Sequence, residues 1–238
     1  MPTILINDDY KNVVKEMKTK GLQVDAIITD SPYCVSRTYQ LGFSNMGRSG
    51  MNYGKWDYNF DQKEWIEVCA PVIKEGGSII IFMDWKNLSY LVEALQDNGF
   101  TVKDLIRWEK PNPMPRNVES RYVMDYEVAI WAVKGKKGWT FNKPKNVSYL
   151  KPVFKGGVVL GKNKRLHPTQ KNLEVFKEII KIHTNPGEIV FDPFSGSGTT
   201  AVACVETGRN SVSTEIDPEY YSKSVERLHG NITSELHW

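Results

Sequence analysis

Short apolar runs alternate with stretches of helical periodicity along most of the chain. The apolar runs have the length and composition of buried strands, and they fall at residues 4–6, 24–29, 78–82, 188–191 and 210–214. Apolar positions at helical spacing predict helices at residues 10–20, 65–73, 88–95, 173–180 and 199–207. Because strands that alternate with helices form a mostly parallel sheet covered on both faces, the pattern predicts an α/β fold.

Local signals predict where individual elements begin and end. Asp61 and Glu64 have the spacing of a helix N-cap and its first-turn partner, and the glycines at 76–77 are expected to end that helix. Two β-rich stretches, 100–108 and 122–133, are expected to pair as the antiparallel edge of the sheet.

Two segments interrupt the alternation of strands and helices. Residues 34–59 are rich in Gly, Ser, Asn and aromatic residues without a sustained period, so we expect a long mobile loop. Residues 134–165 hold ten Lys or Arg and no Asp or Glu, although the whole chain has a formal net charge of only +3. A basic segment on an acidic body indicates a polyanionic partner, although a solvated surface loop would give the same pattern.

Composition excludes several classes of protein. The 238 residues, of which 40% are hydrophobic, suit one large α/β domain or two small ones. No apolar run approaches the roughly 20 residues that span a bilayer, and the first residues lack the pattern of a signal peptide. The three cysteines lie far apart without a CxxC pair, so we expect an intracellular, reduced protein without a metal site.

A glycine-containing turn, F-D-P-F-S-G-S-G-T-T from Phe191 to Thr200, connects a predicted strand to a predicted helix. Gly196 and Gly198 would let the backbone turn tightly and approach a ligand closely. Glu215 ends the next predicted strand about 20 residues further on, where a carboxylate can bind ribose hydroxyls. No Lys follows Gly198, which excludes a P-loop, whereas a nicotinamide-dependent dehydrogenase stays open on this turn alone.

Asp30, Ser31, Pro32 and Tyr33 follow the predicted strand 24–29, at the sheet edge where α/β proteins bind ligands. The exocyclic amino nitrogen of a nucleic-acid base is a poor nucleophile, because its lone pair is delocalised into the ring. A carboxylate and a backbone carbonyl that accept its two N–H bonds would free the lone pair. Pro32 would direct the carbonyl inward, and Tyr33 would stack on a base taken out of the helix. The same residues are common turn formers, so on this loop alone, apart from the glycine turn, a simple turn is an equally good interpretation.

The order of these motifs, D-S-P-Y, the basic segment and then F-S-G-S-G, resembles the β class of amino-DNA methyltransferases. The resemblance covers nearly the whole chain and includes the W-E-K sequence at 108–110 and H-P-T-Q-K at 167–171. Residues 112–122 are similar to small bacterial adenine methyltransferases of this class. The resemblance implies one Rossmann-like S-adenosylmethionine-dependent methyltransferase domain over 1–238, with 134–165 as an inserted DNA target-recognition segment.

The resemblance also implies roles for single residues. Asp30, Ser31, Pro32 and Tyr33 would form the catalytic pocket for the target base, and no metal is implied. The residues that would bind S-adenosylmethionine are Asp9, near its adenine ring, Glu215, at its ribose hydroxyls, and His167, Thr169, Lys171, Asp192, Phe194, Ser195, Gly196, Ser197, Gly198, Thr199 and Thr200, around its methionine end.

Methyl transfer to the exocyclic amino group of adenine in duplex DNA is the activity that this resemblance implies. Adenine enzymes of the class usually carry D-P-P-Y and many cytosine enzymes S-P-P-Y; Asp30 matches the adenine type, whereas Ser31 matches neither. Ser31 therefore leaves two alternatives open, a cytosine-N4 methyltransferase and a DNA-binding relative that has lost catalysis. Carbon-5 methylation is not expected, because it needs a cysteine nucleophile, typically after proline, and Cys34 follows Tyr33.

The family's association with bacteria, their phages and restriction–modification systems implies further partners. We expect a cytoplasmic protein that acts on double-stranded DNA. A cognate restriction endonuclease and a second copy of the chain are its candidate protein partners.

Overall fold

The computed structural model describes residues 3–32, 60–115, 118–159, 170–228 and 232–233. Within these residues the strands are β1 (Thr3–Ile6), β2 (Val24–Asp30), β3 (Ile73–Met83), β4 (Phe100–Glu109), β5 (Tyr126–Lys134), β6 (Val153–Lys155), β7 (Ile189–Asp192), β8 (Asn210–Thr214) and β9 (Ile232–Thr233). The helices are α1 (Tyr10–Thr19), α2 (Gln62–Cys69), α3 (Leu88–Asp97), α4 (Leu173–His183), α5 (Thr199–Thr207) and α6 (Pro218–Leu228), with short 3-10 turns η3 (Ala70–Val72) and η4 (Trp85–Asn87).

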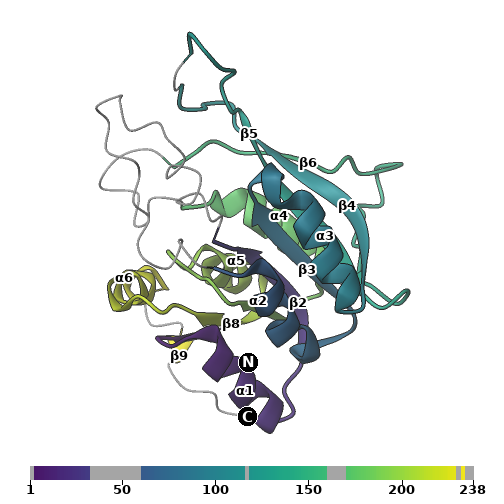
Figure 1. Cartoon of the computed structure of the whole chain (residues 1–238), viewed down its shortest axis with the longest axis vertical. Helices are drawn as coiled ribbons and strands as arrows, with labels where there is room; N and C mark the ends of the chain where they lie inside the picture. Colours follow the sequence, from purple (N-terminus) through teal and green to yellow (C-terminus); the bar gives the residue numbers. More distant parts are fainter. Residues whose placement is uncertain (1–2, 33–59, 116–117, 160–169, 229–231, 234–238) are drawn as a thin grey trace.

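All these strands join one sheet in the order β6-β4-β5-β3-β2-β7-β8-β1-β9 (Figure 1). The strands from β3 through β2, β7, β8 and β1 to β9 run parallel to their neighbours, whereas β5 is antiparallel to both β3 and β4. The predicted antiparallel pair is thus confirmed, but it is not the edge of the sheet. Strand β6, from the basic segment, adds in parallel outside β4 and forms that edge.

Helices cover both faces of the sheet, as the alternation of elements predicts (Figure 1). Ile27, Ile79 and Ile81 point to the face that packs against α1, α2 and α3. Their sequence neighbours Ile28 and Ile80 point to the opposite face, where α4 and α5 pack. This alternation follows from the two-residue period of a strand.

One predicted helix boundary is wrong. The helix that Asp61 caps ends at Cys69, and Ile73 already begins β3. Pro71 lacks the backbone N–H that would continue the helix, so the chain passes through η3 into the strand. The glycines at 76–77 lie inside β3 instead, where a Cβ on Gly76 would come within 2.7 Å of the Gly138 carbonyl oxygen.

The ends of the strands form two further edges of the sheet, at right angles to the outermost strands. Loops occupy both of these edges, but only one carries the predicted motifs. The carboxyl ends of β2, β7, β8 and β1 share an edge with the amino end of β5 and the carboxyl ends of β4 and β6. We call this the carboxyl edge, and the opposite one the amino edge. Side chains after strands that are distant in sequence therefore meet at the carboxyl edge.

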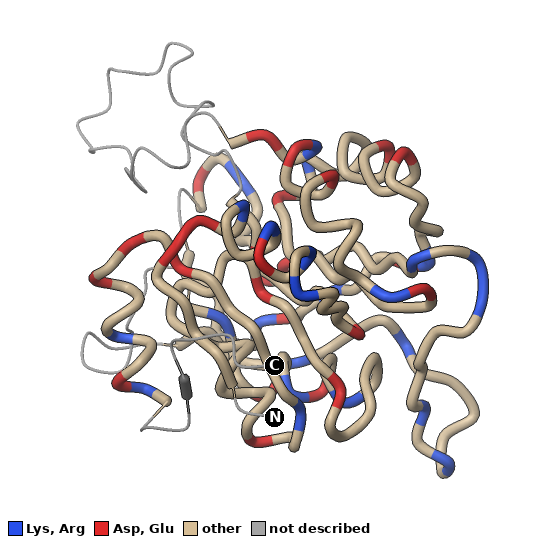
Figure 2. Tube along the Cα trace, turned by 90° about the horizontal axis from the view of Figure 1, so that it is seen from below, with Lys and Arg blue, Asp and Glu red and all other residues tan. Residues whose placement is uncertain are grey.

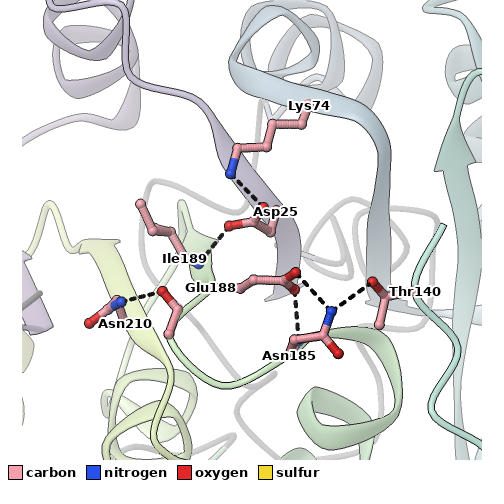
Figure 3. A network of polar contacts seen from close by, with 8 residues as sticks. Asp25, Lys74, Thr140, Asn185, Glu188, Ile189 and Asn210 are labelled. Carbon is pink, nitrogen blue, oxygen red and sulfur yellow. Dashed lines mark hydrogen bonds and ion pairs between the residues drawn. The ribbon is translucent and has the colours of Figure 1, made fainter. Parts of the chain in front are cut away.

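A polar network closes the amino edge (Figure 3). The Asp25 carboxylate pairs with Lys74 at 2.5 Å and accepts a hydrogen bond from the Ile189 backbone N–H at 2.8 Å. Asn185 bonds Glu188 at 3.0 Å and donates to Thr140 Oγ1 at 3.4 Å. Because Thr140 belongs to the basic segment 134–165, the network fixes the first part of that segment at the amino edge.

The basic segment thus runs across the sheet from one edge to the other. Lys134 ends β5 at the amino edge, whereas Lys155 ends β6 beside Glu109 at the carboxyl edge. Over the described residues, Lys and Arg are spread along the trace and are not gathered at one place (Figure 2). Among the described residues no helix has the length and apolarity to cross a membrane.

Candidate active site

Two motifs about 160 residues apart in sequence lie side by side at the carboxyl edge. Strands β2 and β7 are direct neighbours, with Ala26 opposite Val190, so Asp30 and Asp192 end adjacent strands. Thr29 Oγ1 donates a hydrogen bond of 2.7 Å to the Asp192 carboxylate and ties the two strand ends together. The chain leaves β2 toward β3 and leaves β7 toward β8, so the order of the strands reverses here. Such switch points are where α/β sheets bind ligands.

The glycine turn has the backbone conformation that its sequence predicts. Gly196 and Gly198 have φ angles of +51° and +71°, in the left-handed region that favours glycine. The Ser195 N–H donates to the Thr214 carbonyl at 2.9 Å, which joins the turn to β8. A Cβ on Gly198 would lie 3.2 Å from the Ser224 Cβ, so α6 packs closely against the turn.

Glu215 lies against this turn, as its position after β8 predicts. Its carboxylate accepts the Gly196 N–H at 2.8 Å and the Asp217 N–H at 2.9 Å. Burial raises the pKa of Glu215 to about 7, although both hydrogen bonds favour the ionised form. Asp9 follows β1, the neighbour of β8, and its side chain caps α1 by accepting the Lys11 N–H at 2.8 Å.

Phe194 forms an aromatic wall between the glycine turn and the helices α1 and α2. Its ring packs edge-on against Tyr10, Phe60 and Trp65, with centroid distances of 5.2, 5.1 and 5.5 Å. The Phe194 N–H donates to the buried Asp192 carboxylate at 3.1 Å. Burial raises the pKa of Asp192, which the hydrogen bonds from its neighbours only partly offset.

The side chains that follow the glycines bind the protein scaffold. Ser197 and Thr199 both contact Arg227 of α6, whose Nη1 donates to the Ser197 carbonyl at 2.9 Å and to Thr199 Oγ1 at 3.1 Å. Thr200 Oγ1 donates to the Ile28 carbonyl at 3.4 Å. Arg227 is a site residue that the sequence did not indicate, because a lone arginine on an amphipathic helix carries no local signal for this role.

The loop after β2 is held by two contacts. Ser31 is buried, and its Oγ donates to the Phe82 carbonyl at 3.4 Å. The Pro32 carbonyl accepts a hydrogen bond from the Gln62 side chain, whose Oε1 in turn accepts Trp65 Nε1–H at 2.7 Å. Gln62 is therefore a second site residue without a sequence signal. Tyr33, His167 and Thr169, like residues 34–59, lie outside the described residues.

An ionic chain surrounds Asp30. Lys171 Nζ lies 2.9 Å from the Asp30 carboxylate and also pairs with Glu127, which pairs with Lys110 at 2.5 Å. Burial lowers the pKa of Lys171, but the Asp30 and Glu127 carboxylates outweigh it and raise that pKa above its ordinary value. Burial likewise raises the pKa of Glu127, and the two lysines outweigh it and hold that pKa well below its ordinary value. The ammonium of Lys171, a residue predicted to bind the cofactor, thus lies against Asp30, a residue of the predicted catalytic pocket.

Comparison with known proteins identifies the family. A profile of the N6_N4_Mtase family, described as DNA methylase, matches residues 24–226. The type II methyltransferase M2.MboI of Moraxella bovis is 34% identical over 227 residues, which cover 87% of this chain and 81% of that protein. M2.DpnII of Streptococcus pneumoniae is 30% identical over 244 residues, covering 94% and 89%.

A solved structure has the same fold over nearly the whole chain. The crystal structure of the M1.HpyAVI–SAM complex superposes with a TM-score of 0.78 at 41% sequence identity, covering 95% of this chain and 99% of that one. The expected Rossmann-like methyltransferase fold is therefore confirmed.

Proposed function

Because the chain belongs to the N6/N4 DNA methylase family, we propose that it transfers a methyl group from S-adenosylmethionine to the exocyclic amino nitrogen of adenine in duplex DNA. The observation that carries this proposal is the position of Asp30, which ends β2 beside the glycine turn that follows β7. The carboxylate that would accept the target amine thus lies next to the turn that would bind the methyl donor.

The residues present fit S-adenosylmethionine. Glu215 would bind the ribose hydroxyls, since its carboxylate is fixed against the glycine turn at 2.8 Å from the Gly196 nitrogen. Phe194 would form one wall of the pocket, and Asp9 would lie near the adenine ring from the neighbouring strand end. Bound S-adenosylmethionine supplies an electrophilic methyl group on a sulfonium centre.

The residues of this chain would act on the target base. The Asp30 carboxylate would accept one amino N–H, so that the nitrogen lone pair becomes available for in-line attack on the methyl group. A backbone carbonyl of the 30–33 loop would accept the second N–H. Such a displacement depends mainly on positioning and on preorganised electrostatics.

Adenine is the proposed base because Asp30 has the residue type of the adenine enzymes that this chain resembles. Ser31 replaces a proline of that pattern, but it is buried and donates a hydrogen bond to the Phe82 carbonyl. This hydrogen bond restrains the loop, as the ring of a proline would have done at the same position. Loss of catalysis therefore does not follow from Ser31.

Sequencing of DNA from cells that express the chain, with modified bases identified directly, tests this function. We expect N6-methyladenine within one recognition sequence. N4-methylcytosine would support the alternative base, and binding of S-adenosylmethionine without any modified base would identify a relative that has lost catalysis.

Duplex DNA would approach the carboxyl edge, where Asp30 lies. Within the target-recognition segment 134–165, Lys155 lies at this edge, paired in register with Glu109. Lys134 ends β5 at the amino edge, and Asn142 donates to the Thr184 carbonyl at 2.9 Å, just after α4. The lysines between these two residues therefore lie near the amino edge. The segment would therefore contact DNA mainly through its second half.

The relatives are named type II methyltransferases, which supports a cognate restriction endonuclease as a partner in the cytoplasm of a bacterium or phage-infected cell. Co-expression with a nuclease of the same recognition sequence would test this, because only a methylating chain protects the host DNA. Light scattering of the purified chain would decide between a monomer and a homodimer.

A further inference from the structure

We propose that Lys171 and Glu127 are positioning residues for the reaction, which hold the Asp30 carboxylate in place through a largely buried ionic chain that ends at Lys110. This inference rests on the proposed function, because Asp30 is the group that would contact the target amine. Lys171 then acts on the catalytic loop, in addition to any part of the 167–171 motif that meets the cofactor.

Four separate segments bring these charges together. Asp30 ends β2, Lys110 follows β4, Glu127 lies at the start of β5, and Lys171 precedes α4. Lys171 Nζ lies 2.9 Å from Asp30 Oδ1, and Lys110 Nζ lies 2.5 Å from Glu127 Oε1. Lys171 joins the two pairs, because it also contacts the other oxygen of Glu127.

Lys171, at the centre of the ionic chain, is buried, and the other three side chains are partly buried. The side chains of Lys171 and Asp30 are 6% and 19% exposed, and those of Lys110 and Glu127 are 13% and 22% exposed. The Lys171 ammonium also lies 5.7 Å from the centre of the Phe82 ring and 5.9 Å from that of Trp108. Water therefore screens the attraction between Lys171 and Asp30 much less than it would at the surface.

Stability alone is a weak reason to place these charges here. Removing charged side chains from water costs free energy, and well-packed apolar residues often stabilise a core as well or better. The four side chains of the ionic chain carry two positive and two negative charges, so their sum is zero. Removing any one of them would leave a charge without its partner. The ionic chain ends at the carboxylate proposed to be catalytic. A role in orienting that carboxylate and keeping it ionised therefore explains the charges better than stability does.

Each member has a separable effect on Asp30. Lys171 places a cation 2.9 Å from Asp30 Oδ1, which favours the charged form of that carboxylate and would fix its orientation relative to the target N–H. Glu127 shares the Lys171 ammonium with Asp30. An ammonium bound to Asp30 alone would weaken Asp30 as a hydrogen-bond acceptor, and Glu127 prevents this. On the neighbouring strand β7, the Asp192 carboxylate accepts hydrogen bonds from Thr29 and from the Phe194 N–H. The described residues of β7 include no Lys or Arg that could replace Lys171.

Steady-state kinetics of Lys171→Met and Glu127→Gln test the proposal. We expect kcat to fall about 10²-fold in each, as for a reacting group displaced by an ångström, with unchanged KM for DNA. Glu127→Gln, which changes no residue predicted to bind the cofactor, should also keep the affinity for S-adenosylmethionine. Lys177→Met is the matched control, since Lys177 of α4 also pairs with two carboxylates, Glu174 at 3.0 Å and Glu206 at 2.9 Å. Lys171→Arg keeps the charge and should recover part of kcat.

The pH profile separates positioning from a structural role. Without Lys171, Asp30 loses the cation that lies 2.9 Å from it, so its pKa should rise and the acidic limb of kcat/KM should move to higher pH. Without Glu127, Asp30 receives the full effect of the ammonium, and the limb moves to lower pH. Shifts in opposite directions would not result from general loosening of the fold.

Carbon-13 NMR of carboxyl-labelled protein gives a readout without turnover. The titration midpoint of Asp30 should rise in Lys171→Met and stay unchanged in Lys177→Met. An unchanged midpoint in Lys171→Met, or weaker cofactor binding with unchanged kcat in Lys171→Arg and Glu127→Gln, would overturn the proposal. A wild-type chain that methylates no DNA would instead refute the proposed function, and the NMR titration would still test the ionic chain.

Discussion

At the scale of the residue, Asp30 carries the chemistry that we propose. Asp30→Asn keeps the shape of the side chain but removes the negative charge, so methyl transfer should fall by at least about 10²-fold, as when one preorganised polar group is removed from an active site. Cofactor affinity, measured by calorimetry, should remain that of the wild type. Substantial turnover by pure Asp30→Ala protein would contradict the mechanism.

Glu215 provides a second test at this scale. Its carboxylate is fixed by two backbone N–H groups and would form charge-assisted hydrogen bonds to the ribose hydroxyls. Glu215→Ala should weaken S-adenosylmethionine binding by about 1.5–3 kcal/mol. If calorimetry gives an unchanged dissociation constant, Glu215 does not contact the cofactor.

The pKa of Glu215 also predicts a dependence of stability on pH. Burial raises this pKa from its ordinary value of 4.5 to about 7, so the native state keeps a proton that the unfolded chain releases within this window. The free energy of unfolding contributed by Glu215 is therefore present below the window and is lost as the pH rises through it. Denaturant unfolding at several pH values should show a weaker decline for Glu215→Gln, which cannot ionise. Equal declines for both proteins would contradict the shift.

At the scale of the element, the glycine turn and α6 act together. Gly198 and Gly187 both have positive φ angles, +71° and +82°, but only a Cβ on Gly198 would meet a neighbour within 4 Å, at Ser224. Gly187→Ala and Gly198→Ala should each lose about 1–2 kcal/mol of stability from backbone strain. Only Gly198→Ala should also lose cofactor affinity, because it alone displaces the turn from α6. Equal cofactor affinity in both variants would show that the contact with α6 is not needed.

Helix and strand assignments succeeded where the signal was local. Asp61 caps α2 through the Lys63 N–H at 2.8 Å, as predicted, and α5 ends at Thr207, as its predicted range does, with Gly208 at a φ of +71° as its C-cap. The glycine pair at 76–77 was misassigned because glycine ends helices and also permits close backbone contact within strands. Only the neighbouring segment at Gly138 shows which of the two reasons applies.

At the scale of the whole molecule, the two halves of the basic segment should differ in their contribution to DNA binding. Two variants that each neutralise two cations provide a matched comparison, Lys151/Lys155 for the second half and Lys136/Lys137 for the first. The second-half variant should bind all DNA sequences more weakly. Its slope of log affinity against log salt should flatten by about 0.9 for each DNA phosphate that the protein no longer neutralises.

The variant in the first half should keep the affinity and salt slope of the wild type, because its charges lie near the amino edge. Titrations at several salt concentrations, followed by fluorescence anisotropy, measure both quantities. A flatter slope in the first-half variant alone would place the DNA-binding face at the amino edge.

The sequence by itself determined the local features of this protein. Strand and helix periods, the D-S-P-Y loop after β2 and the glycine turn after β7 are contiguous, and their chemistry depends on neighbours in the chain. The position of Glu215 at the end of β8 follows from the same pattern. These features sufficed to predict the α/β fold and the family, and they supply the candidate residues of the site.

Only the tertiary structure decided which distant residues meet. Lys171 and Glu127 join Asp30 because β2, β3 and β5 are neighbours in the sheet, and neither periodicity nor motif spacing specifies strand order or register. The same holds for β6, which pairs with β4 and carries the basic segment from one edge of the sheet to the other. Charge along the sequence indicates a polyanionic partner, but the path of the backbone determines which of those charges lie beside the active site.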